Sequence, residues 1–226
     1  LSGIGLYWLS FAESTTMAFV SATVFAVGVC YFWPTMLGVT SERVPKSGAL
    51  GLALMGGMGM LIVGVVTAPQ MGKIADRYLH ERLVEQRVET AAVLGRVAAT
   101  YPALAADEPE PFKSEILAAV DDVSDVLAGA TLDTLPEGTA NAMRGAIKNA
   151  PKGEAAATVA KDLGGVLNPA DNYGGRMSFR YVAPFAIIII IVFGIIYLRD
   201  RAAGGYKAET LTTGGEPETP EKTEET

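Results

Sequence analysis

SGALGLALMGGMGMLIVGVVTAP, from Ser47 to Pro69, is the stretch that decides the fold of this chain. It carries no charged residue between Gly48 and Ala68, and a helix of that length can cross a hydrocarbon core about 30 Å thick. In a soluble helix each of its glycines would cost about 1 kcal/mol relative to alanine. In a membrane helix small residues let neighbouring backbones approach closely. The stretch therefore predicts a transmembrane helix over residues 48–69.

Small residues recur on one face of this predicted helix. They are Ala49, Ala53, Gly57, Gly64 and Ala68, and we call them the helix-packing stripe. Larger residues, such as Met58 and Val65, fall on the opposite face. Because membrane helices associate through such small-residue faces, we expect the stripe to contact other transmembrane helices. The chain is therefore expected to belong to a polytopic membrane protein.

The composition of the chain divides by region. Half of the 226 residues are hydrophobic, yet the formal net charge is −7. The apolar residues gather in the first 69 positions and in 181–198, whereas the charged residues gather in 70–180 and in the tail. An acidic chain without a basic stripe is not expected to bind nucleic acid. The single Cys30 and the single His80 provide neither a disulfide framework nor a histidine cluster, so we expect no metal and no cofactor.

Two further stretches predict complete transmembrane helices. Residues 17–38 contain no charge, and residues 181–198 form an Ile-rich span that suits wide exposure to lipid. Residues 1–12 are apolar but too short to cross a membrane, so we expect a truncated transmembrane helix that begins in a preceding part of a longer protein. The polar loop 39–47 is so short that the helices on either side of it are expected to be antiparallel.

Residues 70–180 form a long insertion between the last two spans. A typical connection has about 4–6 residues, so an insertion of this length is expected to have a structure of its own. Its apolar residues lie at amphipathic helical spacing and include few large aromatics, which predicts a soluble helical insertion with a thin core. The acidic tail 199–226 is rich in Thr, Glu, Pro and Gly and is expected to be disordered. The predicted fold class is an all-α membrane protein with three transmembrane helices, a truncated one, a small extramembrane insertion and this tail.

The region around the first loop resembles part of a transporter family. The sequence GVCYFWP at positions 28–34, the Glu-x-x-Pro element of Glu42 and Pro45, and the Gly/Ala-rich helix that follows are similar to helices ten and eleven of the major facilitator superfamily. The resemblance implies that the last span is helix twelve and that a long insertion separates it from helix eleven. It also implies two six-helix halves that rock around a site at the membrane midplane.

The resemblance implies a secondary active transporter for a small polar organic solute that is sugar- or nucleoside-like. The interiors of the predicted spans contain no ionisable residue, and the sequence shows no catalytic constellation, so we do not expect an enzyme. Trp33 shares the small-residue face of its helix and is the candidate for the substrate cavity; the alternative is an aromatic residue of the interfacial belt. Glu42 and Arg43 resemble the cytoplasmic charge network of the superfamily; the alternative is a solvated loop.

The expected partners are the lipid bilayer, the preceding N-terminal transmembrane helices of the same protein and the solute. The competing hypothesis is a membrane-anchored binding or assembly protein whose working part is the insertion at 78–176. Basic residues near the short loop and after the last span, including Arg43 and Arg199, predict that these segments are cytoplasmic. Basic residues at the ends of the insertion, including Lys73, Arg77 and Arg180, argue for the opposite orientation. Because long loops cross membranes largely regardless of charge, the short loop has more weight, and we expect the insertion outside. The predicted location is a bacterial plasma membrane with the C-terminus in the cytoplasm.

Overall fold

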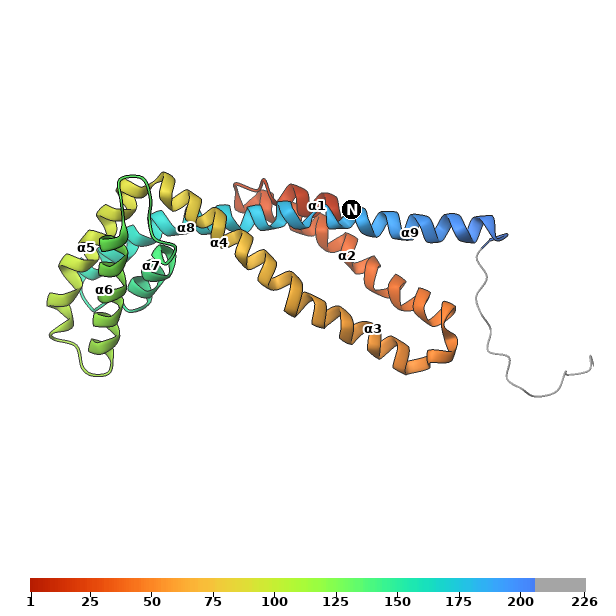
Figure 1. Cartoon of the computed structure of the whole chain (residues 1–226), viewed down its shortest axis with the longest axis horizontal. Coiled ribbons are helices and arrows are strands. Elements are labelled where there is room, and N and C mark those ends of the chain that lie inside the picture. The colour runs from red at the N-terminus through yellow and green to blue at the C-terminus, as the bar shows by residue number, and fades with distance from the viewer. Residues whose placement is uncertain (206–226) are drawn as a thin grey trace, which may run out of the picture.

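The computed structural model describes residues 1–205, and every regular element in that range is a helix. In chain order the α-helices are α1 (Ser2–Leu9), α2 (Thr15–Arg43), α3 (Gly48–Ile62), α4 (Ala68–Glu85), α5 (Arg87–Ala105), α6 (Phe112–Gly129), α7 (Thr139–Lys148), α8 (Glu154–Val182) and α9 (Phe185–Ala202). Figure 1 shows an elongated molecule with a compact bundle of α5, α6 and α7 at one end and long helices extending to the other. Most of the tail predicted to be disordered, residues 206–226, lies outside the described residues.

Three helices are long and apolar enough to cross a membrane. They are Thr15–Arg43, the nearly continuous helix Pro45–Glu85, and Glu154–Ala202, which joins α8 to α9. Almost none of their most apolar portions is buried inside the chain. A long helix that is apolar all round is stable in lipid and not in water. The helices therefore indicate an integral membrane protein. The prediction of an all-helical chain is confirmed for the described residues, and three of its helices are long and apolar enough to span a membrane.

The spans continue past their predicted ends. The loop expected at 39–47 is mostly helical, because α2 runs to Arg43 and a 3-10 turn, Pro45–Ser47, leads directly into α3. The last span begins within α8 and continues to Ala202, so the first residues of the predicted tail are helical. The sequence pattern predicts that each span ends at its first charged residue. A charged residue marks the end of the lipid-exposed part of a helix, but the backbone hydrogen bonds of the helix can continue past it.

The helix that contains the helix-packing stripe changes its winding at the predicted boundary. A π-helical turn, Val63–Thr67, connects α3 to α4. Pro69 lies two residues after this turn and has no N–H to donate to the carbonyl of Val65. A locally wider turn accommodates its ring. The helix then continues to Glu85, so α4 carries the chain out of the apolar region.

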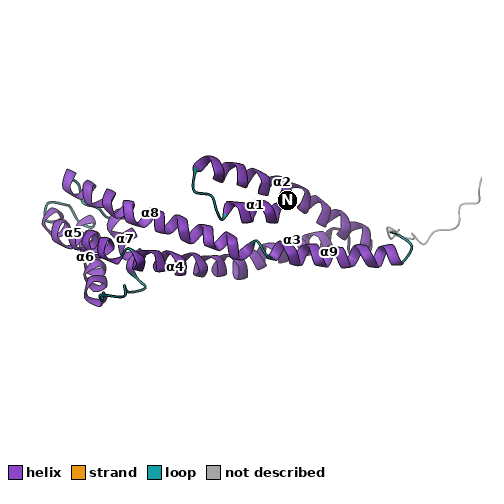
Figure 2. Cartoon of the chain, turned by 90° about the horizontal axis from the view of Figure 1, so that it is seen from above, coloured by secondary structure: helices purple, strands orange, loops and turns teal. Residues whose placement is uncertain are grey.

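Helices α4 and α8 lie side by side and form the most extensive helix–helix contact of the structure (Figures 1 and 2). We call this antiparallel pair the stalk. At Gly174 the two backbones are so close that a methyl group would collide with the carbonyl oxygen of Ala75. The buried Ser178 hydroxyl donates a hydrogen bond to the Met71 carbonyl oxygen, 2.9 Å away. The stalk therefore joins the membrane spans to the bundle, and its two helices are in direct backbone contact with each other.

The bundle and the parts of α4 and α8 that pack against it contain nearly all of the buried apolar side chains. The largest of those that are fully buried are Leu83, Leu94, Val97, Tyr101, Ile116, Val123, Met143 and Leu163. Tyr101 is the one aromatic residue among them, and its hydroxyl donates to the Ala146 carbonyl oxygen at 3.1 Å. Ala146 lies in the last turn of α7, where carbonyl groups lack a helical donor. Burial raises the pKa of Tyr101. Most of this core comes from the part of the chain predicted as a soluble insertion.

Helix α1 corresponds to the predicted truncated helix and packs antiparallel on α2. Gly5 lies against the backbone of Phe25, and Gly28 lies against Ser2. Neither glycine has room for a side chain. Gly3 of the same helix lies against Ala186 of α9. Small residues thus bring α1 close to both α2 and α9 in the described part of the chain, as Gly174 does in the stalk.

Candidate functional site

The helix-packing stripe lies on an open face of α3 and the following turn. Ala49, Ala53, Gly57, Gly64 and Ala68 are all exposed. Nothing in the described chain comes within 4 Å of a Cβ placed at Gly57 or Gly64. The structure thus keeps the five residues on one long helix but brings no described helix against them.

Trp33 lies where α2 faces α3. Its indole ring reaches Gly56, where a Cβ would be 3.8 Å from Cη2, an ordinary van der Waals distance. About two turns further along α2, the Thr40 hydroxyl lies 2.9 Å from the Met55 sulfur of α3. Trp33 is still 47% exposed, because α2 and α3 diverge from their shared turn (Figure 1). The predicted cavity residue therefore lies beside the stripe, on the inner side of an open pair of helices.

Arg43 joins the turn after α2 to the end of α9. Its guanidinium forms an ion pair with Asp200, and both side chains are about one third exposed or less. Glu42, the other residue assigned to the charge network, is exposed in the last turn of α2. Sequence reasoning missed Asp200, although its position between Arg199 and Arg201 was a usable signal. The ion pair brings the α2–α3 turn and the end of the last span to the same end of the molecule, away from the bundle (Figure 1).

A cluster of tyrosines lies on the stalk near the start of the last apolar run. Tyr173, Met177 and Tyr181 recur every four residues on one face of α8, and Tyr78 of α4 packs between the two tyrosines. The Tyr78 and Tyr181 hydroxyl oxygens are 2.6 Å apart. The Arg82 guanidinium lies over the Tyr173 ring, 5.7 Å from its centre. Sequence reasoning missed this cluster, and the four-residue repeat on α8 was its only visible signal.

A hollow of about 340 Å³ opens beside these tyrosines. It is lined by Tyr78, Met177, Arg180, Tyr181 and Pro184. The Arg180 guanidinium stacks over the Phe11 ring, 4.2 Å from its centre, so the turn between α1 and α2 forms a neighbouring wall. Arg176, one turn earlier, donates to the Ala12 carbonyl oxygen of the same turn.

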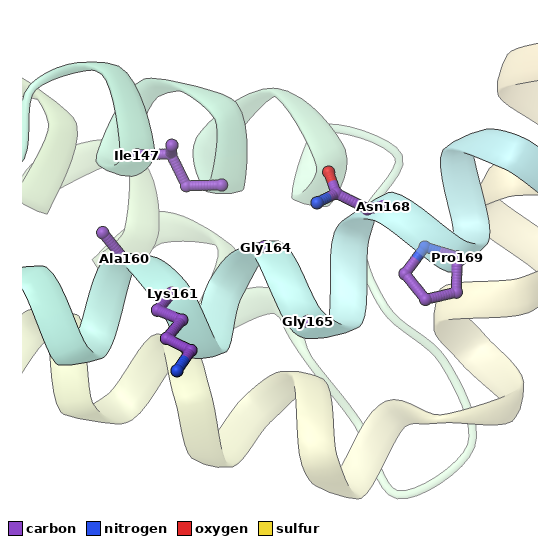
Figure 3. Close-up of a pocket in the computed structure, with 7 residues that line it drawn as sticks. All are labelled: Ile147, Ala160, Lys161, Gly164, Gly165, Asn168 and Pro169. Atoms are coloured by element: carbon purple, nitrogen blue, oxygen red, sulfur yellow. The ribbon is translucent and has the colours of Figure 1, made fainter.

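A second hollow, of about 510 Å³, lies between α7 and α8 in the bundle (Figure 3). It is lined by Ile147, Ala160, Lys161, Gly164, Gly165, Asn168 and Pro169. The two glycines leave the helix surface bare, and Lys161 and Asn168 point in different directions. A ligand site usually has polar groups that converge on the ligand. The arrangement of this hollow does not provide them.

Within residues 1–205, no group of three or more histidine, cysteine, aspartate or glutamate side chains is placed to hold a metal ion. Comparisons of the chain with protein-family models, with curated proteins and with solved structures found no match. The features of the chain that bear on its function are therefore the long apolar helices, the open helix-packing stripe, the charge pair at one end and the stalk with its tyrosine cluster.

Proposed function

We propose that this chain is the C-terminal part of a secondary active transporter that moves a small polar organic solute across a bacterial plasma membrane. The observation that carries the proposal is the open helix-packing stripe. A face of glycine and alanine gives little contact to lipid, whereas it allows another helix to approach closely. Its exposure along α3 supports further transmembrane helices of the same protein as the partners that cover it.

Trp33 is the residue that we assign to the solute cavity. Its ring lies on the inner side of the α2–α3 pair, next to the face that the additional helices would cover. An aromatic ring offers an apolar face on which a sugar or nucleoside ring stacks. Arg43, together with Asp200 and Glu42, would form the charge network that stabilises one conformation of the transporter.

The orientation follows from the positions of the basic residues. Arg43 pairs with Asp200, which stands between Arg199 and Arg201. Because basic residues near the ends of short loops favour the cytoplasm, we propose that this end faces the cytoplasm and that the bundle lies outside. Single cysteines at Ser114 and Ala203, in a Cys30→Ser background, test this with a membrane-impermeant maleimide on intact cells. Labelling at 203 without labelling at 114 would invert the orientation.

Transport is tested with the complete protein, including all transmembrane helices that precede this chain, in proteoliposomes. We expect saturable uptake of a labelled sugar or nucleoside that depends on an ion gradient. Trp33→Ala should weaken the apparent affinity, while Tyr31→Ala on the other face of α2 should not. Gly57→Leu should block uptake by preventing helix contact at the stripe. Normal uptake by Gly57→Leu, or equal effects of the two aromatic variants, would contradict these assignments.

The 1–226 chain alone should not transport, because a midplane site requires both halves of such a transporter. Saturable and substrate-specific uptake by this chain in liposomes would refute its assignment as one part of a larger transporter. The measurement uses the same panel of sugars and nucleosides as the complete protein.

The bundle favours a second candidate function, a membrane-anchored binding or assembly protein. Its buried core is built from α5, α6 and α7 together with parts of α4 and α8, and the insertion is far larger than a connection between spans needs to be. Replacing residues 87–153 with a short flexible linker distinguishes the two functions, because α4 and α8 are antiparallel neighbours that such a linker can join. Retained uptake would favour a transporter with an accessory bundle. Intact spans without any uptake in either protein would favour the anchored binding protein.

A further inference from the structure

The hollow beside the tyrosine cluster lies at the boundary between the apolar and the charged parts of the chain. Arg180 is the last charged residue before the apolar run 181–198. On the other side of the stalk the uncharged run that begins at Gly48 ends at Lys73, five residues before Tyr78. Tyrosine and arginine at such a boundary occupy the level of the lipid headgroups. The hollow therefore faces the headgroup layer of one leaflet.

Arg180 differs from the other arginines at this level in its partners. Arg77 pairs with Glu81 at 3.0 Å, Arg82 with Glu85 at 2.5 Å, and Arg176 approaches Glu13 at 4.0 Å. Among the ion pairs of residues 1–205, none involves Arg180. Its one hydrogen-bond acceptor in that range is the Met177 sulfur at 4.0 Å, which is a weak acceptor. The cation therefore keeps most of its donors for another group.

The Phe11 ring holds the Arg180 guanidinium beside the hollow. The guanidinium carbon lies over this ring, 4.2 Å from its centre, which is a cation–π distance. A planar guanidinium with a free edge matches the geometry of two phosphate oxygens. The Tyr78 and Tyr181 hydroxyls share one hydrogen bond, which uses one of their two protons. The remaining proton is available to a second acceptor, so the hollow offers an arginine fork and a hydroxyl donor together.

We propose that this hollow binds the phosphate of an anionic phospholipid headgroup. Basic pockets between membrane helices on one side of the bilayer bind such headgroups. The apolar surface of α9 begins directly below Pro184 and supplies the wall along which the acyl chains lie. A lipid at this position contacts α4, α8 and the α1–α2 turn together, and so stabilises the point where the stalk leaves the membrane. The proposal does not depend on transport, because it requires only the membrane spans and the stalk.

The test measures lipid binding by the full chain in detergent with native mass spectrometry, by titrating phosphatidylglycerol and, separately, phosphatidylcholine. We expect a preference for phosphatidylglycerol, and a loss of at least about tenfold in its affinity in Arg180→Gln, since hydrogen bonds to charged groups are among the strongest. Arg77→Gln is the matched control, because it removes the same charge at the same level from an arginine that is 75% exposed and already paired. We expect less than about a twofold change there.

Further variants keep the proposal testable if Arg180→Gln does not fold. Arg180→Lys keeps the charge but loses the fork and should bind phosphatidylglycerol more weakly than the wild type. Tyr78→Phe combined with Tyr181→Phe should also reduce binding. Equal losses in Arg180→Gln and Arg77→Gln would overturn the proposal, because they would indicate unspecific attraction to the anionic lipid. Displacement of the lipid by millimolar inorganic phosphate would overturn the lipid assignment, because the hollow would then be a site for free phosphate.

Discussion

Two parts of this chain use glycine in a helix, and their surroundings are opposite. In the stalk, Gly174 lies directly against the backbone of Ala75. In α3 and the π turn, Gly57 and Gly64 face open space. Both parts show small residues in a membrane-proximal helix, so the pattern indicates that a helix packs against something without revealing its partner. The stalk finds its partner within the chain, whereas the stripe does not find one among the described residues.

The bundle and the spans also differ in how far their leucine side chains are buried inside the chain. Leu94 in the bundle is fully buried, whereas Leu50 on α3 is 76% exposed. Burial away from water stabilises the bundle at about 25 cal/mol per Å² of apolar surface. The spans gain the corresponding free energy mainly from lipid, because almost none of their most apolar portions is buried inside the chain. Mutations in the two parts should therefore have unequal effects, and hydrogen exchange of the full chain in nanodiscs resolves them locally.

The largest effect is expected in the core of the bundle. Leu94→Ala removes a fully buried side chain and should lower the free energy of unfolding of the bundle by about 2–5 kcal/mol. Leu132→Ala is the matched control, because Leu132 is 90% exposed in the same part of the chain, and its effect should remain within about 0.5 kcal/mol. Hydrogen exchange of the α5 and α8 amides measures both. Similar protection in the two variants would mean that the bundle has no cooperative core.

The next effect concerns the stalk and compares neighbouring glycines. Gly174→Ala should destabilise the stalk by about 1–3 kcal/mol, because its methyl group meets the Ala75 carbonyl. Gly175→Ala has open space around it and should gain up to about 1 kcal/mol from better helix propensity. Exchange of the α4 amides near Ala75 gives the measurement. A gain in both variants would show that the close contact between α4 and α8 does not form.

A smaller effect is expected at Tyr101. Tyr101→Phe removes the hydrogen bond to the Ala146 carbonyl oxygen and should cost about 1 kcal/mol at neutral pH. Because burial raises the pKa of Tyr101 in the folded state, the protonated hydroxyl favours folding below the unfolded pKa of about 10. That contribution is lost as the pH rises through the folded pKa. The difference in bundle stability between the wild type and Tyr101→Phe should therefore shrink above about pH 10, and a constant difference would contradict the assignment.

The smallest effect is expected at the ion pair between Arg43 and Asp200. Both side chains are partly exposed, so their interaction energy should be about 1 kcal/mol or less. A double-mutant cycle with Arg43→Gln and Asp200→Asn, followed by thermal unfolding in detergent, isolates the pair from the other contacts of Arg43. The coupling should decrease at high salt. A coupling of several kcal/mol would show that this end of the molecule is closed to water.

The sequence alone predicted the parts of the candidate site that depend on local pattern. The charge-free runs predicted the three spans, because a helix of that length and composition must face lipid. Amphipathic spacing predicted helices in the insertion, and the structure contains them as α5, α6, α7 and the first part of α8. Trp33 was assigned to the small-residue face of its helix, and in the structure it lies against α3.

Only the tertiary structure decided which residues from distant parts of the chain meet. Tyr78 and Tyr181 are 103 positions apart, and Arg43 and Asp200 are 157 apart, so no local period connects them. The continuation of the spans into a stalk also depends on packing, because α4 and α8 cover one another where their sequences have already become polar. The local sequence pattern shows whether a side chain requires lipid, water or a protein core around it. The path of the folded chain decides which residues from distant parts of the sequence become its neighbours.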